Sequence, residues 1–172
     1  MLDILYKRRS VRRFTSEEVE KEKIERILHA GLLAPSSKSK YPCEFIVCDQ
    51  AELNQNLAAS KPGGANFLKY APVSIVITGD EEKSDVWIED CSIAAAYMLL
   101  QAEKENLGAC WVQIRERKYD EDQLAEAYIR EVLQIPENQK VLAIIGLGKK
   151  DGEKEGRDES FLMKEKIHWN KF

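Results

Sequence analysis

Three arginines and a serine lie close together near the start of the chain, in the segment Arg8-Arg9-Ser10-Val11-Arg12. The guanidinium group donates hydrogen bonds in a planar fork that matches the oxygen atoms of a phosphate. The segment follows a short predicted helix, so the arginines lie where the helix dipole is negative. A helix N-terminus can hold a phosphate with backbone groups, whereas this end needs explicit cations. The segment therefore predicts a phosphate site, unless its cations only balance the helix dipole.

A loop rich in hydroxyl groups follows the next predicted helix and has the sequence Ala34-Pro35-Ser36-Ser37-Lys38-Ser39. Hydroxyl groups both donate and accept hydrogen bonds, so such a loop can contact the polar edge of a ligand. The same composition is also typical of a solvated loop, and the segment alone leaves both roles open.

Several kinds of site are not supported by the sequence. Neither G-x-G-x-x-G nor G-x-x-x-x-G-K-[ST] occurs, so a nucleotide would have to be held by arginines and short loops. No pair among the four cysteines is spaced as C-x-x-C, and the two histidines are far apart. We therefore expect no zinc site and four reduced thiols. The residues concerned are Cys43, Cys48, Cys91, Cys110, His29 and His168.

The composition indicates one globular domain spanning residues 1–172. A formal net charge of -4 argues against a general nucleic-acid binder, which needs a concentrated basic face. Asp3 lies where a signal peptide would carry positive charge. No uncharged apolar run reaches the roughly 18 residues of a membrane span. We therefore expect a cytoplasmic protein without membrane or nucleic-acid partners.

The hydrophobic pattern predicts helices alternating with four short strands. Thr15 and Glu18 form a capping-box pattern, which predicts a second helix that ends before Pro35. Asp120 and Gln123 are predicted to cap a later helix that reaches Leu133. Further helices are expected over 52–59 and 88–106, and strands over 45–48, 73–77, 109–114 and 141–145. The last strand is entirely apolar, so we expect it in the centre of the sheet.

Two apolar segments need a surface to pack against. The helix over 88–106 is apolar nearly all round between Ala94 and Leu100, which predicts cover by a partner subunit as well as by its own chain. The polar tail ends in Ile167, Trp169 and Phe172. These groups pack either on another subunit or on their own chain, and the sequence leaves both open.

Seven segments of the chain occur in an order and with a spacing that are typical of one known family. They are Arg8-Arg9-Ser10-Val11-Arg12-Arg13-Phe14, Ala34-Pro35-Ser36-Ser37-Lys38-Ser39-Lys40-Tyr41-Pro42-Cys43, Ala71-Pro72-Val73, Asp90-Cys91-Ser92-Ile93-Ala94-Ala95, Gly108-Ala109-Cys110-Trp111, Ile135-Pro136 and Gly146-Leu147-Gly148. With them the chain resembles the nitroreductase family of FMN enzymes over nearly its whole length. It departs from the family pattern at Ser39, Tyr41 and Cys43, where Asn, Gln and Trp are frequent. The resemblance implies that flavin binding survives while the substrate range differs.

The resemblance implies an α+β nitroreductase-like fold, with a central mixed β-sheet flanked by helices. It also implies an intertwined homodimer with two FMN sites at the subunit interface. The residues expected at the FMN phosphate are Arg8, Arg9, Ser10, Gly148, Lys149 and Arg157. Those expected at the flavin ring are Arg12, Asn66, Val112 and Gln113. The other subunit is expected to contribute Pro35, Ser36, Ser37, Lys38 and Ser39.

The function implied is transfer of hydride from NADH or NADPH through flavin N5 to a small acceptor, in two half-reactions. The acceptor would be a nitroaromatic, a quinone or free flavin. The cofactor performs the bond chemistry, so no side-chain nucleophile or base is required. Two alternatives stay open: another flavin reaction on the same scaffold, such as dehalogenation or flavin breakdown, and a non-enzymatic FMN-binding or redox-sensing protein.

Overall fold

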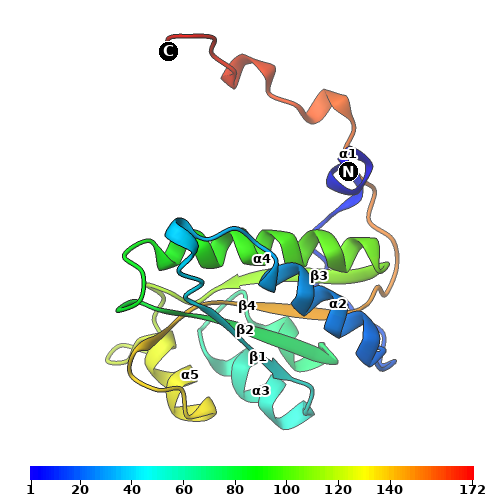
Figure 1. Cartoon of the computed structure of the whole chain (residues 1–172). Helices are drawn as coiled ribbons and strands as arrows, with labels where there is room; N and C mark the ends of the chain where they lie inside the picture. Colours follow the sequence, from blue (N-terminus) through cyan, green and yellow to red (C-terminus); the bar gives the residue numbers. More distant parts are fainter.

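A four-stranded sheet forms the centre of the computed structural model, which describes residues 1–172 (Figure 1). Its strands are β1 (Cys43–Cys48), β2 (Val73–Asp80), β3 (Leu107–Gln113) and β4 (Gln139–Lys149). Their order is β1-β2-β4-β3, so β4 lies between β2 and β3. The prediction of a central position for the apolar strand 141–145 is therefore confirmed.

The α+β class is confirmed, but the predicted mixed sheet is wrong, because all paired strands are antiparallel. β2 and β3 run in the same direction, yet they do not pair, since β4 lies between them and is antiparallel to both. The parallel pairing that does occur is an isolated bridge between Ser10 and Ala109. It places the arginine segment beside β3.

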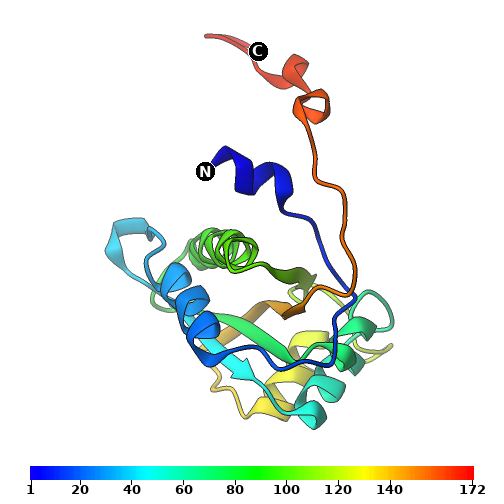
Figure 2. The same ribbon diagram turned by 90° about the vertical axis from the view of Figure 1, so that its right-hand side faces the viewer.

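Helices cover both faces of the sheet. α2 (Lys21–Leu32) and α4 (Trp87–Lys104) lie on one face, while α3 (Ala51–Ala59) and α5 (Ala125–Leu133) lie on the other (Figure 1). α1 (Leu2–Lys7) stands apart from the sheet (Figure 2). Four short 3-10 turns complete the structure: η1 (Ser37–Ser39), η2 (Asn66–Tyr70), η3 (Glu159–Phe161) and η4 (Lys164–Lys166).

The core is divided into two layers by the alternation of side chains along the strands. Ile75 and Ile77 of β2 pack toward α4, with Met98 among their neighbours. Val76, which lies between them in sequence, packs on the opposite face with Leu57. Successive side chains of a strand point to opposite faces, so a continuous apolar strand requires helices on both sides.

Two predicted helix starts are wrong. α2 begins at Lys21, not after Thr15, and no side chain caps it. Instead, the Thr15 backbone N–H donates to the Lys149 carbonyl at 3.0 Å, which keeps this segment extended beside the end of β4. Similarly, the Asp120 carboxylate accepts the N–H groups of Asp122 and Gln123 at 2.9 and 2.8 Å, which closes a turn ahead of α5.

The apolar centre of α4 has one covered and one uncovered side. Ala95 and Met98 are fully buried against the sheet, whereas Ile93 and Tyr97 are 39% and 43% exposed. No helix in the structure has the length and apolar character needed to cross a bilayer. The end of the tail extends away from the sheet (Figure 2), and Trp169 near its end is exposed. Within one chain, neither of the two apolar segments noted in the sequence is fully covered.

Candidate functional site

The arginine segment runs along β3 and is held there by backbone hydrogen bonds. The Val11 N–H donates to the Ala109 carbonyl at 3.0 Å, next to the bridge that Ser10 makes with the same residue. Gly108 allows this close approach, because a Cβ atom there would lie 2.7 Å from Cγ1 of Val11. Gly108 in β3 therefore allows the arginine segment to lie against this strand.

The guanidinium groups of the arginine segment and of the adjacent Arg13 differ in their partners. Arg13 forms an ion pair with Asp151 at 2.9 Å, and Arg9 donates to the Glu155 carbonyl at 2.6 Å. The side chains of Arg8 and Arg12 make neither a hydrogen bond nor an ion pair within the chain. Two cations are therefore free to bind an external anion.

The pKa of the Cys110 thiol in β3 is affected by these cations. Burial raises the pKa of Cys110, and the positive charges of Arg12 and Arg8 act in the opposite direction. The Ser10 hydroxyl also lowers the pKa of this thiol. Arg8, Ser10 and Arg12 thus gather around one part of the edge strand.

The chain returns to this segment after β4. The Lys154 ammonium donates to the Ser10 carbonyl at 2.8 Å, and the Arg157 N–H donates to the Tyr6 carbonyl at 2.8 Å. The Arg157 guanidinium lies over the ring of Phe161, 3.6 Å from its centroid. The return places Arg157 beside the arginine segment, and Lys154 is a neighbouring cation that the sequence did not single out.

Gly148 and Lys149, both predicted at the phosphate, have other contacts in the structure. Gly148 is buried, and a Cβ atom there would lie 2.7 Å from Pro72 and 2.9 Å from Phe14. The Lys149 ammonium lies 2.9 Å from the Glu17 carboxylate. These contacts give Gly148 a packing role and Lys149 an ion pair, so their phosphate contact stays a prediction.

The end of β3 carries two further predicted residues, Val112 and Gln113. Val112 is buried, and because β3 is an edge strand its alternate backbone groups point away from the sheet. The Gln113 carbonyl accepts a hydrogen bond from the Lys61 ammonium at 3.1 Å. Burial lowers the pKa of Lys61, and the charge of Arg117 lowers it further. Asn66 is exposed at the start of η2. No sequence pattern pointed to Lys61, because its contact depends on the fold.

The serine loop, residues 34–41, lies at the opposite edge of the sheet, ahead of β1. The buried carboxylate of Asp90 accepts hydrogen bonds from the Ser36 hydroxyl at 3.0 Å and from the Ser37 N–H at 2.9 Å. A single chain therefore does not bring this loop to the arginine segment.

Three residues of this loop adopt the left-handed conformation: Lys38, Ser39 and Tyr41 have φ values of 52°, 53° and 46°. Each such residue costs on the order of 1 kcal/mol, so the loop needs anchors. Asp90 supplies one anchor, and the Lys83 ammonium supplies another by donating to the Tyr41 carbonyl at 2.9 Å. Pro35, Lys38 and Ser39 are exposed.

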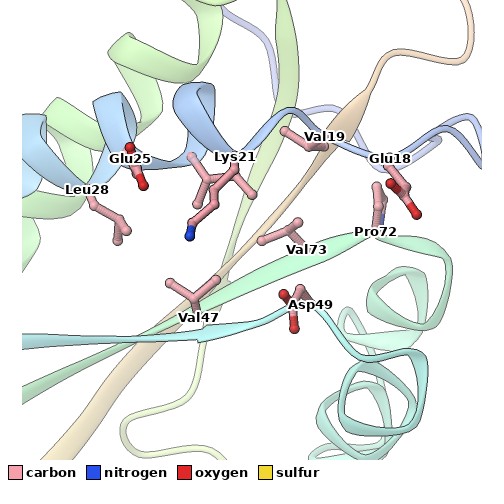
Figure 3. A pocket seen from close by; sticks show the side chains of 10 residues that line it. Glu18, Val19, Lys21, Glu25, Leu28, Val47, Asp49, Pro72 and Val73 are labelled. Atoms are coloured by element: carbon pink, nitrogen blue, oxygen red, sulfur yellow. The ribbon is translucent and has the colours of Figure 1, made fainter.

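A separate hollow of about 580 Å³ lies between the start of α2 and the strands β1 and β2 (Figure 3). Apolar side chains such as Val47 and Val73 line it. Its charged groups are the carboxylates of Glu18, Glu25 and Asp49 and the ammonium of Lys21. The excess of carboxylates disfavours a phosphate, and none of the predicted site residues lines this hollow.

Comparison with known proteins identifies the family. The model of the nitroreductase family matches residues 5–61 and 49–149. A protein of Archaeoglobus fulgidus, provisionally named NADH dehydrogenase/NAD(P)H nitroreductase, is 34% identical over 158 residues, which are 90% of this chain and 87% of that protein.

Solved structures agree with this match. An FMN-dependent nitroreductase from Clostridium difficile is 50% identical, with a TM-score of 0.98 and full coverage of both chains. The NADPH:FMN oxidoreductase from Vibrio harveyi, complexed with NAD+, is 24% identical and shares the fold, with a TM-score of 0.82 over 99% of this chain and 77% of that chain. This chain therefore belongs to the nitroreductase family of oxidoreductases.

Proposed function

We propose that two copies of this chain form a homodimer that binds FMN at the subunit interface and uses NADH or NADPH to reduce a small organic acceptor. The observation that carries the proposal is the pair of unpartnered guanidinium groups, Arg8 and Arg12, beside the edge strand β3. The names of two relatives, an FMN-dependent nitroreductase and an NADPH:FMN oxidoreductase, support this cofactor and this electron donor.

The residues beside β3 fit the phosphate of FMN. A phosphate monoester carries close to two negative charges at neutral pH, and arginine forks match its oxygens. Arg8 has no carboxylate partner, and Arg9 is engaged only by a backbone carbonyl. The Ser10 hydroxyl adds a donor. Gly148, Lys149 and Arg157 would extend the phosphate end, and the hydrogen bond from the Arg157 N–H to the Tyr6 carbonyl supports this role for Arg157.

Arg12 fits the other end of the same ligand. FMN supplies the redox chemistry when it is bound, because its ring accepts electrons from a reduced nicotinamide and passes them to an acceptor. A fixed cation beside the ring stabilises the negative charge that reduction adds. The unpaired Arg12 guanidinium provides such a cation, while backbone groups of Val112 and Gln113 and the side chain of Asn66 would bind the ring edge.

The serine loop completes the site only from a second copy, because one chain holds it at the far edge of the sheet. In this proposal, Pro35, Ser36, Ser37, Lys38 and Ser39 of one subunit approach the cations of the other. The apolar face of α4 around Tyr97 and the apolar end of the tail supply surfaces for the interface.

The specific acceptor class is a nitroaromatic, a quinone or free flavin. Anaerobic mixing with NADH tests the proposed activity: bleaching of the flavin absorbance shows electron uptake, whereas an unchanged spectrum with both NADH and NADPH would favour a binding or sensing protein. Steady-state kinetics with the three acceptor classes then assigns the acceptor. A halogenated acceptor in the same series tests the dehalogenation alternative.

The protein is expected to purify yellow, and the extracted flavin should be FMN. In this proposal Arg8, Arg9 and Arg157 serve one phosphate, and no dinucleotide-binding glycine motif is present to hold an adenylate. Mass spectrometry of the released cofactor measures this directly. Extraction of FAD, or failure to retain any flavin after reconstitution, would contradict the proposed cofactor.

Arg12→Ala and Arg8→Ala should affect the reduction potential differently. Arg8 would bind a phosphate whose charge does not change on reduction, so its loss should weaken FMN binding about equally in both redox states. Arg12 would face the ring, where charge is added. A charge-assisted hydrogen bond contributes roughly 1.5–3 kcal/mol, which corresponds to a fall of roughly 30–60 mV for Arg12→Ala.

Redox titration of both variants at saturating FMN measures this difference, with the wild type as the reference. Arg13→Ala is the matched control, because Arg13 directly follows Arg12 but is paired with Asp151. Equal potential shifts for Arg8→Ala and Arg12→Ala would show that the ring and phosphate roles are assigned wrongly.

A further inference from the structure

Two thiols that are 48 residues apart in sequence meet between β1 and α4. The Cys91 thiol donates to the sulfur of Cys43, with the two Sγ atoms 2.9 Å apart. Cys91 is fully buried, whereas Cys43 is partly exposed. No third metal-ligating side chain joins them. The pair therefore has the geometry for sulfur–sulfur chemistry and not for a metal site.

The fold makes room for this pair at Gly79. Gly79 of β2 lies opposite Cys43 in the strand register, and a Cβ atom on it would lie 2.8 Å from Sγ of Cys91. The Cys91 thiol can also donate to the Thr78 carbonyl at 3.3 Å. The missing side chain lets the helix thiol reach the sheet and approach Cys43. A disulfide needs the sulfur atoms to close to about 2.05 Å, a movement of about 0.9 Å.

We propose that Cys43 and Cys91 are a site of reversible oxidation, at which hydrogen peroxide converts the two thiols into an intramolecular disulfide. The Cys43 thiolate attacks one peroxide oxygen, the O–O bond breaks, and one water leaves after protonation, which gives a sulfenic acid at Cys43. The Cys91 sulfur then attacks the Cys43 sulfur and the S–O bond breaks. The Cys91 proton leaves with the hydroxyl as a second water. Two thiols are oxidised and one peroxide is reduced to two waters.

The two cysteines differ in ways that assign these roles. The hydrogen bond from Cys91 lowers the pKa of Cys43, and this effect exceeds the opposing effect of burial. The hydrogen bond to Cys43 and burial both raise the pKa of Cys91. The thiolate is the nucleophile in such reactions, so Cys43 attacks first and Cys91 resolves. A hollow of about 40 Å³ is lined by Cys43, Ser36 and Tyr41 and has room for a peroxide-sized molecule.

The thiol pair is directly connected to the strained serine loop. Asp90, which anchors Ser36 and Ser37, precedes Cys91 in α4, and Cys43 follows Tyr41 by two residues. A disulfide would thus join both ends of the anchored loop to the same helix turn. This placement is independent of whether flavin binds, so the failure of the proposed cofactor would leave the thiol chemistry unaffected.

The test uses the full-length purified protein, fully reduced and then treated with hydrogen peroxide. Remaining thiols are alkylated under denaturing conditions and counted by intact mass. The reduced protein should carry four alkyl groups, one for each cysteine, and the oxidised protein two. Peptide mapping without reductant should show a Cys43–Cys91 cross-link within one chain, and dithiothreitol should restore four alkyl groups.

Three variants separate this site from other oxidation. Cys43→Ser should keep all three of its remaining thiols. Cys91→Ala should stop at the sulfenic acid of Cys43, which dimedone traps. Cys48→Ser, at the other end of β1, should still lose two thiols. If Cys91→Ala does not fold, the proposal is tested by Cys43→Ser alone, because Cys43 is partly exposed and its substitution disturbs the core less. Four thiols after peroxide, a different cross-link, or thiol loss in Cys43→Ser would overturn the proposal.

Discussion

Tyr97→Glu should leave the protein monomeric at micromolar concentration. Tyr97 is 43% exposed beside Ile93 on the uncovered side of α4, where we propose that a second subunit packs. A buried, unpaired carboxylate costs about 3 kcal/mol or more, and a symmetric dimer would bury two of them. The combined cost of about 6 kcal/mol corresponds to roughly a 10⁴-fold increase in the dimer dissociation constant. Multi-angle light scattering should give twice the chain mass for wild type and a single chain mass for the variant.

Tyr70→Glu is the matched control, because Tyr70 is 67% exposed but belongs to η2 and not to α4. It should keep the mass and flavin content of the wild type. The monomeric Tyr97→Glu protein should also lose most of its flavin, since the serine loop of the other subunit is then missing from the proposed site. A variant that stays dimeric would place the interface elsewhere, and a flavin-loaded monomer would contradict a shared site.

Asp90→Ala should destabilise the protein by about 3 kcal/mol, because hydrogen bonds to a charged group contribute roughly 1.5–3 kcal/mol each. Asp90 is 4% exposed, and its carboxylate accepts from Ser36, Ser37 and Ser84 at 3.0, 2.9 and 3.4 Å. For a chain of this size, that loss lowers Tm by roughly 6–12 °C. The strained turn around Ser39 loses an anchor at the same time, so protease cleavage between residues 36 and 41 should become faster.

Thermal unfolding of flavin-free protein measures the stability change without a contribution from ligand binding. Asp85→Ala is the control: its carboxylate is 80% exposed and lies 4.0 Å from the Lys40 ammonium. Surface changes of this kind alter stability by less than about 0.5 kcal/mol. Asp90→Asn keeps one oxygen as an acceptor, so its Tm should lie between those of Asp85→Ala and Asp90→Ala. Similar Tm values for Asp85→Ala and Asp90→Ala would show that Asp90 does not anchor the loop.

Strong hydrophobic patterns in the sequence were sufficient to predict the central elements. The expected strands 73–77 and 141–145 lie within β2 and β4, and the expected helix 88–106 differs from α4 by two residues or fewer at each end. Such apolar runs have only a buried position available to them, so their pattern determines their place. The helix starts were harder to predict, because Thr15 and Asp120 form backbone contacts in an extended segment and a turn.

For the site, the sequence was sufficient to predict the kinds of residues involved and the family. The arginine segment and the later motifs occur in the order that is typical of the family. Tertiary structure decided which groups meet. Gly108 lets the arginine segment lie against β3. Lys61 reaches Gln113 only because the intervening η2, β2, α4 and β3 pack together. Cys43 and Cys91 belong to motifs read separately, yet the pairing of β1 with β2 and the absence of a side chain at Gly79 bring their sulfur atoms together. Contacts between distant segments depend on packing, which a local pattern does not encode.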